Sequence, residues 1–179
     1  MPQIEIRPVI PTDMTVLQNI DHSYKSIHAW QMDRQFREGH ISIKFHEIRL
    51  PRPVWVEYPI TIDEQNNSMQ HCSVMLTAIL KNKPVGYICI KEQTSPSTAW
   101  VKDLVVDGPA RRQGIASGLI LAAQEWGLQN NLRRIILEMQ SKNHPAIQLA
   151  FKLGYEFCGY HDHYYANHDI ALFFARFLH

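Results

Sequence analysis

The chain has 179 residues, of which 45% are hydrophobic and 20% are charged, and its formal net charge is +1. This length suits one domain with a substantial core, and the near-zero charge excludes the basic field typical of nucleic-acid binders. No apolar run is long enough for a transmembrane helix, and the N-terminus lacks a basic-then-apolar leader. The three cysteines are too few and too scattered for a disulfide framework. We therefore expect a single cytoplasmic domain over residues 1–179 without a nucleic-acid or membrane partner.

The N-terminal segment predicts a strand followed by a helix. Residues 4–8 read as a short strand, and Thr12 or Asp13 is a good cap for a helix that runs toward Ile20. Residues 21–40 are polar and aromatic without a clear period. We predict a loop with helical pieces for this stretch.

The next segment is predicted to be extended and then irregular. Alternating apolar residues over 41–50 indicate a half-buried strand, and prolines bracket another short extended piece at 54–56. The polar run 63–70 predicts a surface loop.

Three further strands are predicted before residue 107 and two near the C-terminus. Residues 73–80 and 85–91 flank a polar turn and read as a hairpin, and 98–106 is the next strand. Two more strands are expected near 155–160 and at 169–177.

The segment 103–118 contains the most informative motif, a short strand that leads through a turn into a helix start. A helix start leaves about four backbone N–H groups unpaired and carries partial positive charge. Small residues around Gly114 let an anion approach these amides closely. This arrangement predicts a phosphate site, and it lacks both the lysine of a P-loop and the three glycines of a dinucleotide fingerprint. The candidate ligands are Arg111, Arg112, Gln113, Gly114, Ile115, Ala116 and Ser117.

A helix, a strand and a second helix follow this motif. An apolar stripe from Ile115 to Trp126 predicts a helix that ends near Gly127, and residues 134–140 read as a buried strand. Asn143 is a good N-cap for the second helix, which Gly154 would end.

Two motifs in this order resemble those of the GNAT superfamily of N-acetyltransferases. Residues 111–116 match Arg/Gln-x-x-Gly-x-Gly/Ala, which is similar to the acetyl-CoA pyrophosphate loop of that family. The Leu-Glu-Met of 137–139, the Asn-x-x-Ala of 143–146 and the Lys-x-Gly-Tyr of 152–155 resemble its second series. Residues 156–174 are similar to the C-terminal part of streptothricin acetyltransferases.

The resemblance implies an α/β (α+β) GNAT fold. Its central sheet would have about six to seven strands, mostly antiparallel and flanked by helices, with a V-shaped splay between the two central strands. Residues 98–160 would bind acetyl-CoA, and 21–60 would form the acceptor side. The other residues implied in cofactor binding are Leu104, Val105, Val106, Asn143, Ala146 and Phe151.

Acetyl transfer needs a base to deprotonate the amine and benefits from an acid at the departing thiolate. Glu138, in an otherwise apolar strand, is the candidate base, and relatives place a carboxylate at the matching position. The alternative is a structural ion pair with Arg133 or Arg134. Asp103 either faces the acceptor or pairs with a neighbouring cation, Lys102 or Arg112.

The acid is not evident in this sequence. Many relatives have a tyrosine where this chain has Ala150. Tyr164 and Tyr165 are candidates, and water or unassisted departure of the thiolate are the alternatives. His161 and His163 alternate as two residues of one strand would, with His168 nearby, so they could share a metal ligand. No partner cysteine lies close in the sequence and histidines are common in tight loops, so no metal is predicted.

The sequence therefore predicts an acetyl-CoA-dependent N-acetyltransferase that transfers the acetyl group directly to a primary amine. A small-molecule acceptor is expected, such as an antibiotic of the streptothricin type, and a homodimer is possible. A protein N-terminal or lysine amine is the second hypothesis. The third is an acyl-CoA-binding module without catalysis, which Ala150 in place of tyrosine favours.

Overall fold

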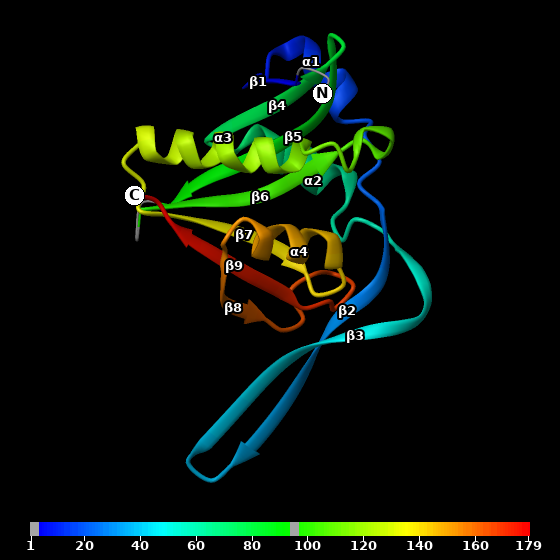
Figure 1. Cartoon of the computed structure of the whole chain (residues 1–179), viewed down its shortest axis with the longest axis vertical. Coiled ribbons are helices and arrows are strands. Elements are labelled where there is room, and N and C mark those ends of the chain that lie inside the picture. The colour runs from blue at the N-terminus through cyan, green and yellow to red at the C-terminus, as the bar shows by residue number, and fades with distance from the viewer. Residues whose placement is uncertain (1–3, 94–96) are drawn as a thin grey trace.

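The computed structural model describes residues 4–93 and 97–179. Its strands form a seven-stranded sheet in the order β1-β4-β5-β6-β7-β9-β8 and a separate hairpin of β2 and β3 (Figure 1). The elements are β1 (Ile4–Pro8), α1 (Pro11–Leu17), β2 (Tyr24–Arg37), β3 (His40–Val56), α2 (Ile62–Gln70), β4 (Val74–Leu80), β5 (Lys83–Gln93), β6 (Thr98–Val106), a 3-10 turn (Gly108–Ala110), α3 (Ile115–Gln129), β7 (Arg134–Gln140), α4 (His144–Lys152), β8 (Glu156–His161) and β9 (Ala171–Phe177).

The sheet confirms the predicted mixed, mostly antiparallel architecture. The β6–β7 pair is parallel, and the other strand pairs of the sheet are antiparallel. The predicted hairpin of 73–80 and 85–91 is also confirmed, as β4 and β5 joined by a tight turn. Lys81 and Asn82 in this turn both adopt positive φ, which matches the twist of the two strands.

The central strands are buried on both faces, because helices cover each side of the sheet. In β5, Ile88 and Ile90 belong to a core cluster with residues of α3 and α4. Tyr87 and Cys89 alternate with them and belong to a second cluster with residues of α1 and α2. This two-sided burial makes β5 a nearly continuous apolar run.

The hairpin of β2 and β3 corrects the prediction for residues 21–40. We expected a loop with helical pieces, but Tyr24–Arg37 is a strand that pairs with β3 along almost its whole length. The outer half of the hairpin projects away from the sheet (Figure 1). Most of its residues there are exposed, so no burial imposes the alternating pattern that identifies a strand in a sequence. The expected strand at 41–50 is confirmed as part of β3.

The prolines of β3 lie where the hairpin pairing is interrupted. The register moves from His28↔Arg49 to Ser26↔Val54, so residues 50–53 lie opposite a single residue of β2. Pro51 and Pro53 fall in this interruption, where their lack of an N–H removes no ladder hydrogen bond.

Helix α2 corrects the predicted surface loop at 63–70. The Thr61 hydroxyl accepts a hydrogen bond from the Glu64 backbone N–H at 3.2 Å, and the Glu64 carboxylate accepts one from the Thr61 backbone N–H at 2.7 Å. This reciprocal capping box corresponds to the Thr-x-x-Glu pattern, which is typical of a helix start. The polarity of the segment alone does not distinguish such a helix from a surface loop. Gln65 and Met69 of this helix are buried.

The other predicted elements differ only at their ends. Helix α1 starts at Pro11, and Asp13 accepts a hydrogen bond from the Ile10 backbone N–H at 3.0 Å. Helix α3 continues two residues beyond Gly127. Asn143 caps α4, because its side chain accepts a hydrogen bond from the Ala146 N–H at 3.2 Å. Gly154 ends that helix with φ of 74°.

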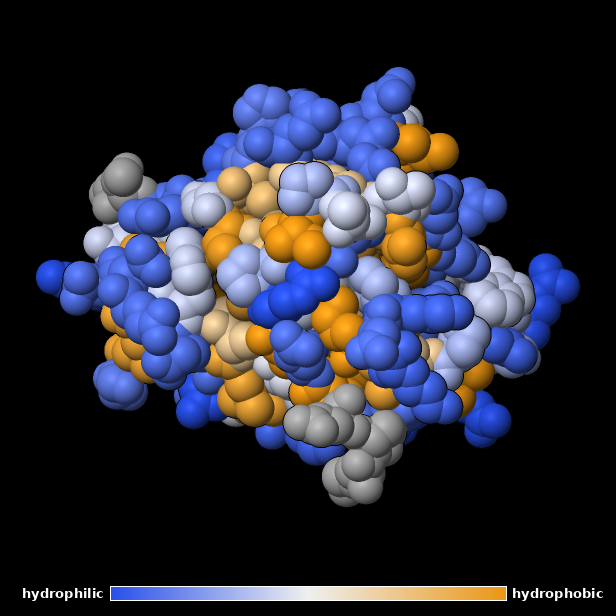
Figure 2. All heavy atoms as spheres, turned by 90° about the horizontal axis from the view of Figure 1, so that it is seen from above, coloured by the Kyte–Doolittle hydropathy of each residue, from blue (hydrophilic) through white to orange (hydrophobic). Residues whose placement is uncertain are grey.

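The surface seen from the end of the molecule that carries β1 and α1 is mixed. Hydrophobic residues gather near its centre, and hydrophilic residues surround them (Figure 2). Among the described residues, no helix combines the length and the apolar character that crossing a membrane would require.

The capping box of α2 gives a test of the corrected element. We expect Thr61→Ala to lower the free energy of unfolding by about 1 kcal/mol, because it leaves a first-turn N–H without its side-chain partner. Urea denaturation measures the loss. Thr15→Ala is the matched control, since Thr15 is exposed within α1 and caps nothing. Equal stability of the two variants would contradict the role of the capping box.

Candidate active site

The central feature of the site is a gap between β6 and β7. These parallel strands pair only from Thr98↔Arg134 to Val101↔Leu137. Beyond that point they separate, while β6 continues to pair with β5 as far as Val106. The V-shaped splay expected between the central strands is therefore present. The edge of β6 over residues 104–106 faces the gap, where its backbone groups can pair with an extended ligand.

Helix α3 begins beside this gap, at the turn that follows β6. Gly114 precedes the helix with φ of 83° and makes no side-chain cap. A Cβ atom built on Gly114 would meet no atom within 4 Å, so the space beside this helix start is open. The first-turn amides of α3 thus combine partial positive charge with access, as an anion site requires.

The two arginines of the turn have different surroundings. The Arg111 guanidinium donates hydrogen bonds to the backbone oxygens of Val106, Ser23 and Asp21, at 2.8, 3.0 and 3.0 Å. Arg111 therefore joins the turn to residues 21–23. Arg112 is exposed, with φ of 65°. Of the two, Arg112 is the more accessible to the phosphate groups of a ligand, because the Arg111 guanidinium already donates to three backbone oxygens.

The remaining cofactor candidates lie on both sides of the gap. Ile115 is buried in the core, and the Gln113 side chain donates to the Pro109 backbone oxygen at 3.3 Å. Phe151 is partly exposed and contacts the rings of Trp30 and Phe174. Their roles in binding acetyl-CoA stay predictions, as do those of Ala116, Ser117 and Ala146.

Glu138 lies at the apex of the V and connects the two strands. Its carboxylate accepts hydrogen bonds from Lys102 at 2.6 Å, the Trp100 indole at 2.7 Å and the Tyr164 hydroxyl at 3.2 Å. The side chain is only 6% exposed. The ion-pair partner is thus Lys102, and neither Arg133 nor Arg134, which we had considered, fills that position. All three donors share one oxygen, Oε2, and they hold the carboxylate between the two strands.

Burial lowers the pKa of Lys102, but the Glu138 carboxylate outweighs burial and leaves that pKa above its usual value. Burial first, and then the Glu138 charge, raise the pKa of Tyr164. Tyr165 has a raised pKa for the same two reasons, and the charge of Asp103 adds to the effect. Both tyrosines therefore carry their protons near neutral pH.

Asp103 is the second carboxylate of the site, and its surroundings contrast with those of Glu138. A bulge at Lys102 in β6 shifts the register against β5, from Cys89↔Asp103 to Ile90↔Val101. Asp103 is 3% exposed and accepts one hydrogen bond, from the Ser68 hydroxyl at 3.1 Å. Its Oδ1 atom is buried and lacks a partner among the residues that the structure describes. Burial, with the Glu138 charge second, raises the pKa of Asp103 to about 7.

A pocket of about 400 Å³ opens beside Asp103, between α2 and strands β5 and β6. Ser68, Cys89 and Lys102, which also surround Asp103, are among its lining residues. The complete lining is Glu64, Asn67, Ser68, His71, Cys72, Cys89, Lys91 and Lys102. None of these lining residues lies in the range 21–60 that we predicted for the acceptor side, and that assignment stays a prediction.

A hydrogen-bond network occupies the far end of the gap. The Tyr24 hydroxyl donates to the Gln140 side-chain oxygen at 2.8 Å, and the Gln140 amide donates to Asp169 at 2.9 Å. Lys142 forms an ion pair with Asp169 at 2.6 Å. Burial, with the Asp169 charge second, raises the pKa of Tyr24. This network fixes the end of β7 against the base of the hairpin.

The histidines considered for a metal do not share a strand. Strand β8 ends at His161, and His163 lies in the following turn with φ of 51°. His163 forms an ion pair with Asp162 at 3.1 Å. The prediction that both imidazoles point to the same side of one strand is therefore wrong.

Comparison with known proteins agrees with this architecture. The sequence profile of the GNAT acetyltransferase family matches residues 27–155. The chain therefore belongs to the GNAT family, and it is an acyltransferase that uses acetyl-CoA as its acetyl donor. No curated protein sequence gave a match.

Solved structures of acetyltransferases share this fold. The structure is similar to nourseothricin acetyltransferase, with a TM-score of 0.85 and 17% identity over 98% of this chain and 99% of that one. It is also similar to a Bacillus anthracis protein described as a streptothricin acetyltransferase, in complex with acetyl coenzyme A. The TM-score is 0.77 and the identity 21%, over 99% of this chain and 98% of that one.

A protein-modifying enzyme is similar as well. The ribosomal-protein-S18-alanine N-acetyltransferase of Escherichia coli has a TM-score of 0.70 and 14% identity, over 98% of this chain and 94% of that one. At these identities the likeness establishes the fold and leaves the acceptor open.

The α3 start gives a direct test of acetyl-CoA binding. We expect Gly114→Val to weaken acetyl-CoA affinity by about tenfold or more, a change of at least about 1.4 kcal/mol. A β-branched side chain is strained at this φ and would occupy the open space beside the amides. Isothermal titration calorimetry measures the affinity.

Gly39→Val is the matched control, because Gly39 also has positive φ and open space but lies in the turn of the hairpin. We expect this variant to bind acetyl-CoA as tightly as the wild type. Equal affinities in the two variants would remove the α3 start from the cofactor site.

Proposed function

We propose that the chain transfers the acetyl group directly to a primary amine of a small molecule, with Asp103 as the general base. The observation that carries this proposal is the buried Asp103 carboxylate, with a pKa of about 7, beside a pocket of about 400 Å³. A volume of this size is typical of small-molecule sites. A base whose pKa lies near the working pH is also the most effective one.

The gap between β6 and β7 and the open α3 start fit acetyl-CoA. Acetyl-CoA supplies a thioester carbonyl as the electrophile. The amides of the α3 start would hold the phosphates, and the free edge of β6 would hold the extended arm. The apex of the V, where β6 and β7 stop pairing, would then lie near the reacting carbonyl carbon. Asp103 and Glu138 would lie on the side from which the acceptor amine approaches.

In the proposed acetyl transfer, Asp103 accepts a proton and Tyr164 donates one. The acceptor enters as a protonated amine, and the Asp103 carboxylate removes one proton so that the nitrogen lone pair can attack the carbonyl carbon. The C–S bond then breaks, and the thiolate needs one proton. Tyr164 carries its proton at neutral pH and can donate it to the thiolate. The nitrogen gives up a second proton as it becomes an amide, and this proton returns to Tyr164 through Lys102, whose Nζ lies 3.4 Å from the Tyr164 hydroxyl. The proton taken by Asp103 leaves to solvent.

Glu138 takes a positioning role in this scheme in place of our earlier assignment as base. Its Oε2 atom already accepts hydrogen bonds from Lys102, Trp100 and Tyr164. Asp103 Oδ1 has no partner among the described residues, so it is the oxygen more open to a proton from the amine. Glu138 instead orients Tyr164 and raises the pKa of Asp103.

The acceptor class is tested by following thiol release with three sets of amines. We expect turnover with small polyamines and with streptothricin-type antibiotics, on which structural neighbours are named to act. Peptides with free N-termini or lysines should react at least about a hundredfold more slowly. Faster reaction of the peptides would replace the small-molecule proposal. Saturable acetyl-CoA binding without turnover on any amine would favour the binding-module hypothesis.

The base assignment is tested by the pH profile of kcat/KM with one acceptor. Wild-type activity should rise with pH through a pKa near 7, because Asp103 must be ionised to accept a proton. Asp103→Asn should lower kcat/KM by about 100-fold or more. The amide is similar in size and removes a buried charge, so the variant should remain folded.

Two further variants separate Asp103 from Glu138. Glu138→Gln removes a negative charge that raises the pKa of Asp103. The rise of kcat/KM with pH, here called the acidic limb, should therefore move to lower pH. Ser68→Ala removes the hydrogen bond to the ionised form, so the limb should move to higher pH. Loss of the limb in Glu138→Gln, with the limb intact in Asp103→Asn, would assign the base to Glu138.

A further inference from the structure

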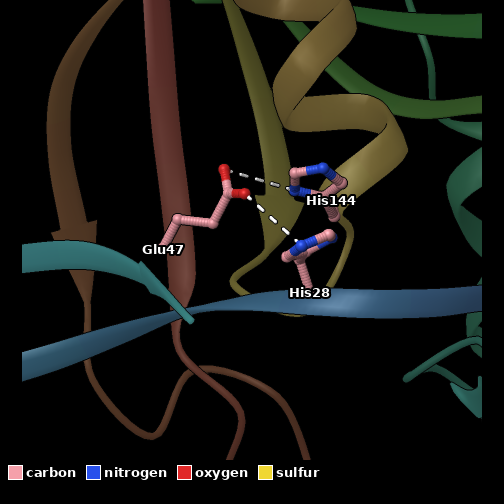
Figure 3. A group of neighbouring side chains, drawn as sticks. All are labelled: His28, Glu47 and His144. Carbon is pink, nitrogen blue, oxygen red and sulfur yellow. Dashed lines mark ion pairs between the residues drawn. The ribbon is translucent and has the colours of Figure 1, made fainter. Parts of the chain in front are cut away.

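Three side chains with metal-binding atoms converge where the hairpin crosses the start of α4. His28 comes from β2, Glu47 from β3 and His144 from the first residue of α4 (Figure 3). One ligand atom of each lies within 4.8 Å of the other two. The Trp30 backbone N–H donates to the Ser141 backbone oxygen at 2.9 Å and holds β2 in this position. The cluster is thus assembled by tertiary structure from distant parts of the chain.

The Glu47 carboxylate lies between the two imidazoles. One oxygen is 3.9 Å from His28 Nε2, and the other is 3.7 Å from His144 Nδ1. Both distances exceed a hydrogen bond. Ligands bound to Zn²⁺ at about 2.0 to 2.2 Å lie roughly 3.4 Å from one another in tetrahedral geometry. Small side-chain rotations would therefore bring the three atoms to coordination distance.

The polar atoms of this cluster are incompletely satisfied. His144 Nδ1, which faces Glu47, is buried without a hydrogen-bond partner among the described residues, and so is His28 Nδ1. The two imidazole rings lie 4.7 Å apart, with 36° between their planes. A buried nitrogen without a partner is costly, and a cation between the three groups would meet the lone pair of His144 Nδ1.

The composition of the cluster indicates which cation would bind. Two imidazoles and one carboxylate form a ligand set that Zn²⁺ accepts, and the fourth position would remain for water. The Gln148 amide, one turn along α4, donates to Glu47 at 3.4 Å and can orient the carboxylate while the other oxygen binds the ion. The site is partly exposed, which leaves a path for the ion to enter.

We propose that His28, Glu47 and His144 form a binding site for a divalent transition-metal ion, of which Zn²⁺ is the natural candidate. None of these three residues belongs to the candidate active site around Asp103 and Glu138. The metal site would also affect the helix α4, because His144 directly follows Asn143, the cap of that helix. A bound ion would join both strands of the hairpin to the helix whose start borders the cofactor gap.

Calorimetric titration of the full chain with zinc chloride, after treatment with a chelator and dialysis, tests the site. We expect one binding event in the wild type and at least about tenfold weaker binding in His28→Gln, Glu47→Gln and His144→Gln. His46→Gln is the matched control, since His46 lies in the same hairpin and faces Asp33 at 3.3 Å. This control should bind zinc like the wild type.

Cobalt(II) provides a second readout that does not depend on heat. A site with four ligands gives Co²⁺ visible absorption bands far stronger than those of the hydrated ion, and these bands should be lost in Glu47→Gln. Glu47→Gln is the deciding variant, because Glu47 is on the exposed side of the cluster and its replacement leaves both imidazoles in place. Its thermal unfolding without metal shows whether it folds.

Two results would overturn the proposal. One is zinc binding of equal affinity and stoichiometry in the wild type and in a folded Glu47→Gln variant. The other is a cobalt spectrum of the wild type that matches the hydrated ion. Either result would show that the cluster is a pair of histidines beside a carboxylate and nothing more.

Discussion

The active site depends on the point where β6 and β7 stop pairing. Up to Val101↔Leu137 the two strands share a ladder, and their side chains fill the core. Beyond it the backbone of β6 must find another partner, because unpaired N–H and C=O groups are costly when they are buried. An extended ligand can supply those hydrogen bonds. The same separation brings Lys102 of β6 to Glu138 of β7, so the free strand edge and the carboxylates of the candidate site follow from a single interruption of the sheet.

The two carboxylates beside that interruption show how surroundings assign roles to identical chemical groups. Glu138 accepts three hydrogen bonds, one of them from an ammonium group. Asp103 accepts one, from a hydroxyl, and its burial, with the Glu138 charge second, raises its pKa to about 7. Neighbouring acids with different surroundings are typical of active sites. The bulge at Lys102 contributes to it, since two successive residues of β6 reach the same region.

The elements from β6 to α4 were predicted more accurately than those from β2 to α2. The turn at Gly114, the cap at Asn143 and the buried strand of Glu138 leave local signals, because each depends on backbone conformation or burial within one segment. The hairpin of β2 and β3 and the pocket beside α2 depend on contacts between distant segments. Lys102 could not be identified as the partner of Glu138, since the bulge that positions it has no residue signature. Only the capping box of α2 was readable and overlooked.

Arg111 links two regions that the sequence separates by almost ninety positions. Its guanidinium donates to the backbone of Asp21 and Ser23 as well as to Val106, at the end of β6. Tyr24, the next residue, reaches the end of β7 through Gln140. These contacts tie the turn before α3, the residues that lead into β2 and the end of β7 to one another. Loss of the Arg111 guanidinium would therefore release residues 21–23 from the end of β6 and leave Tyr24 as their link to β7.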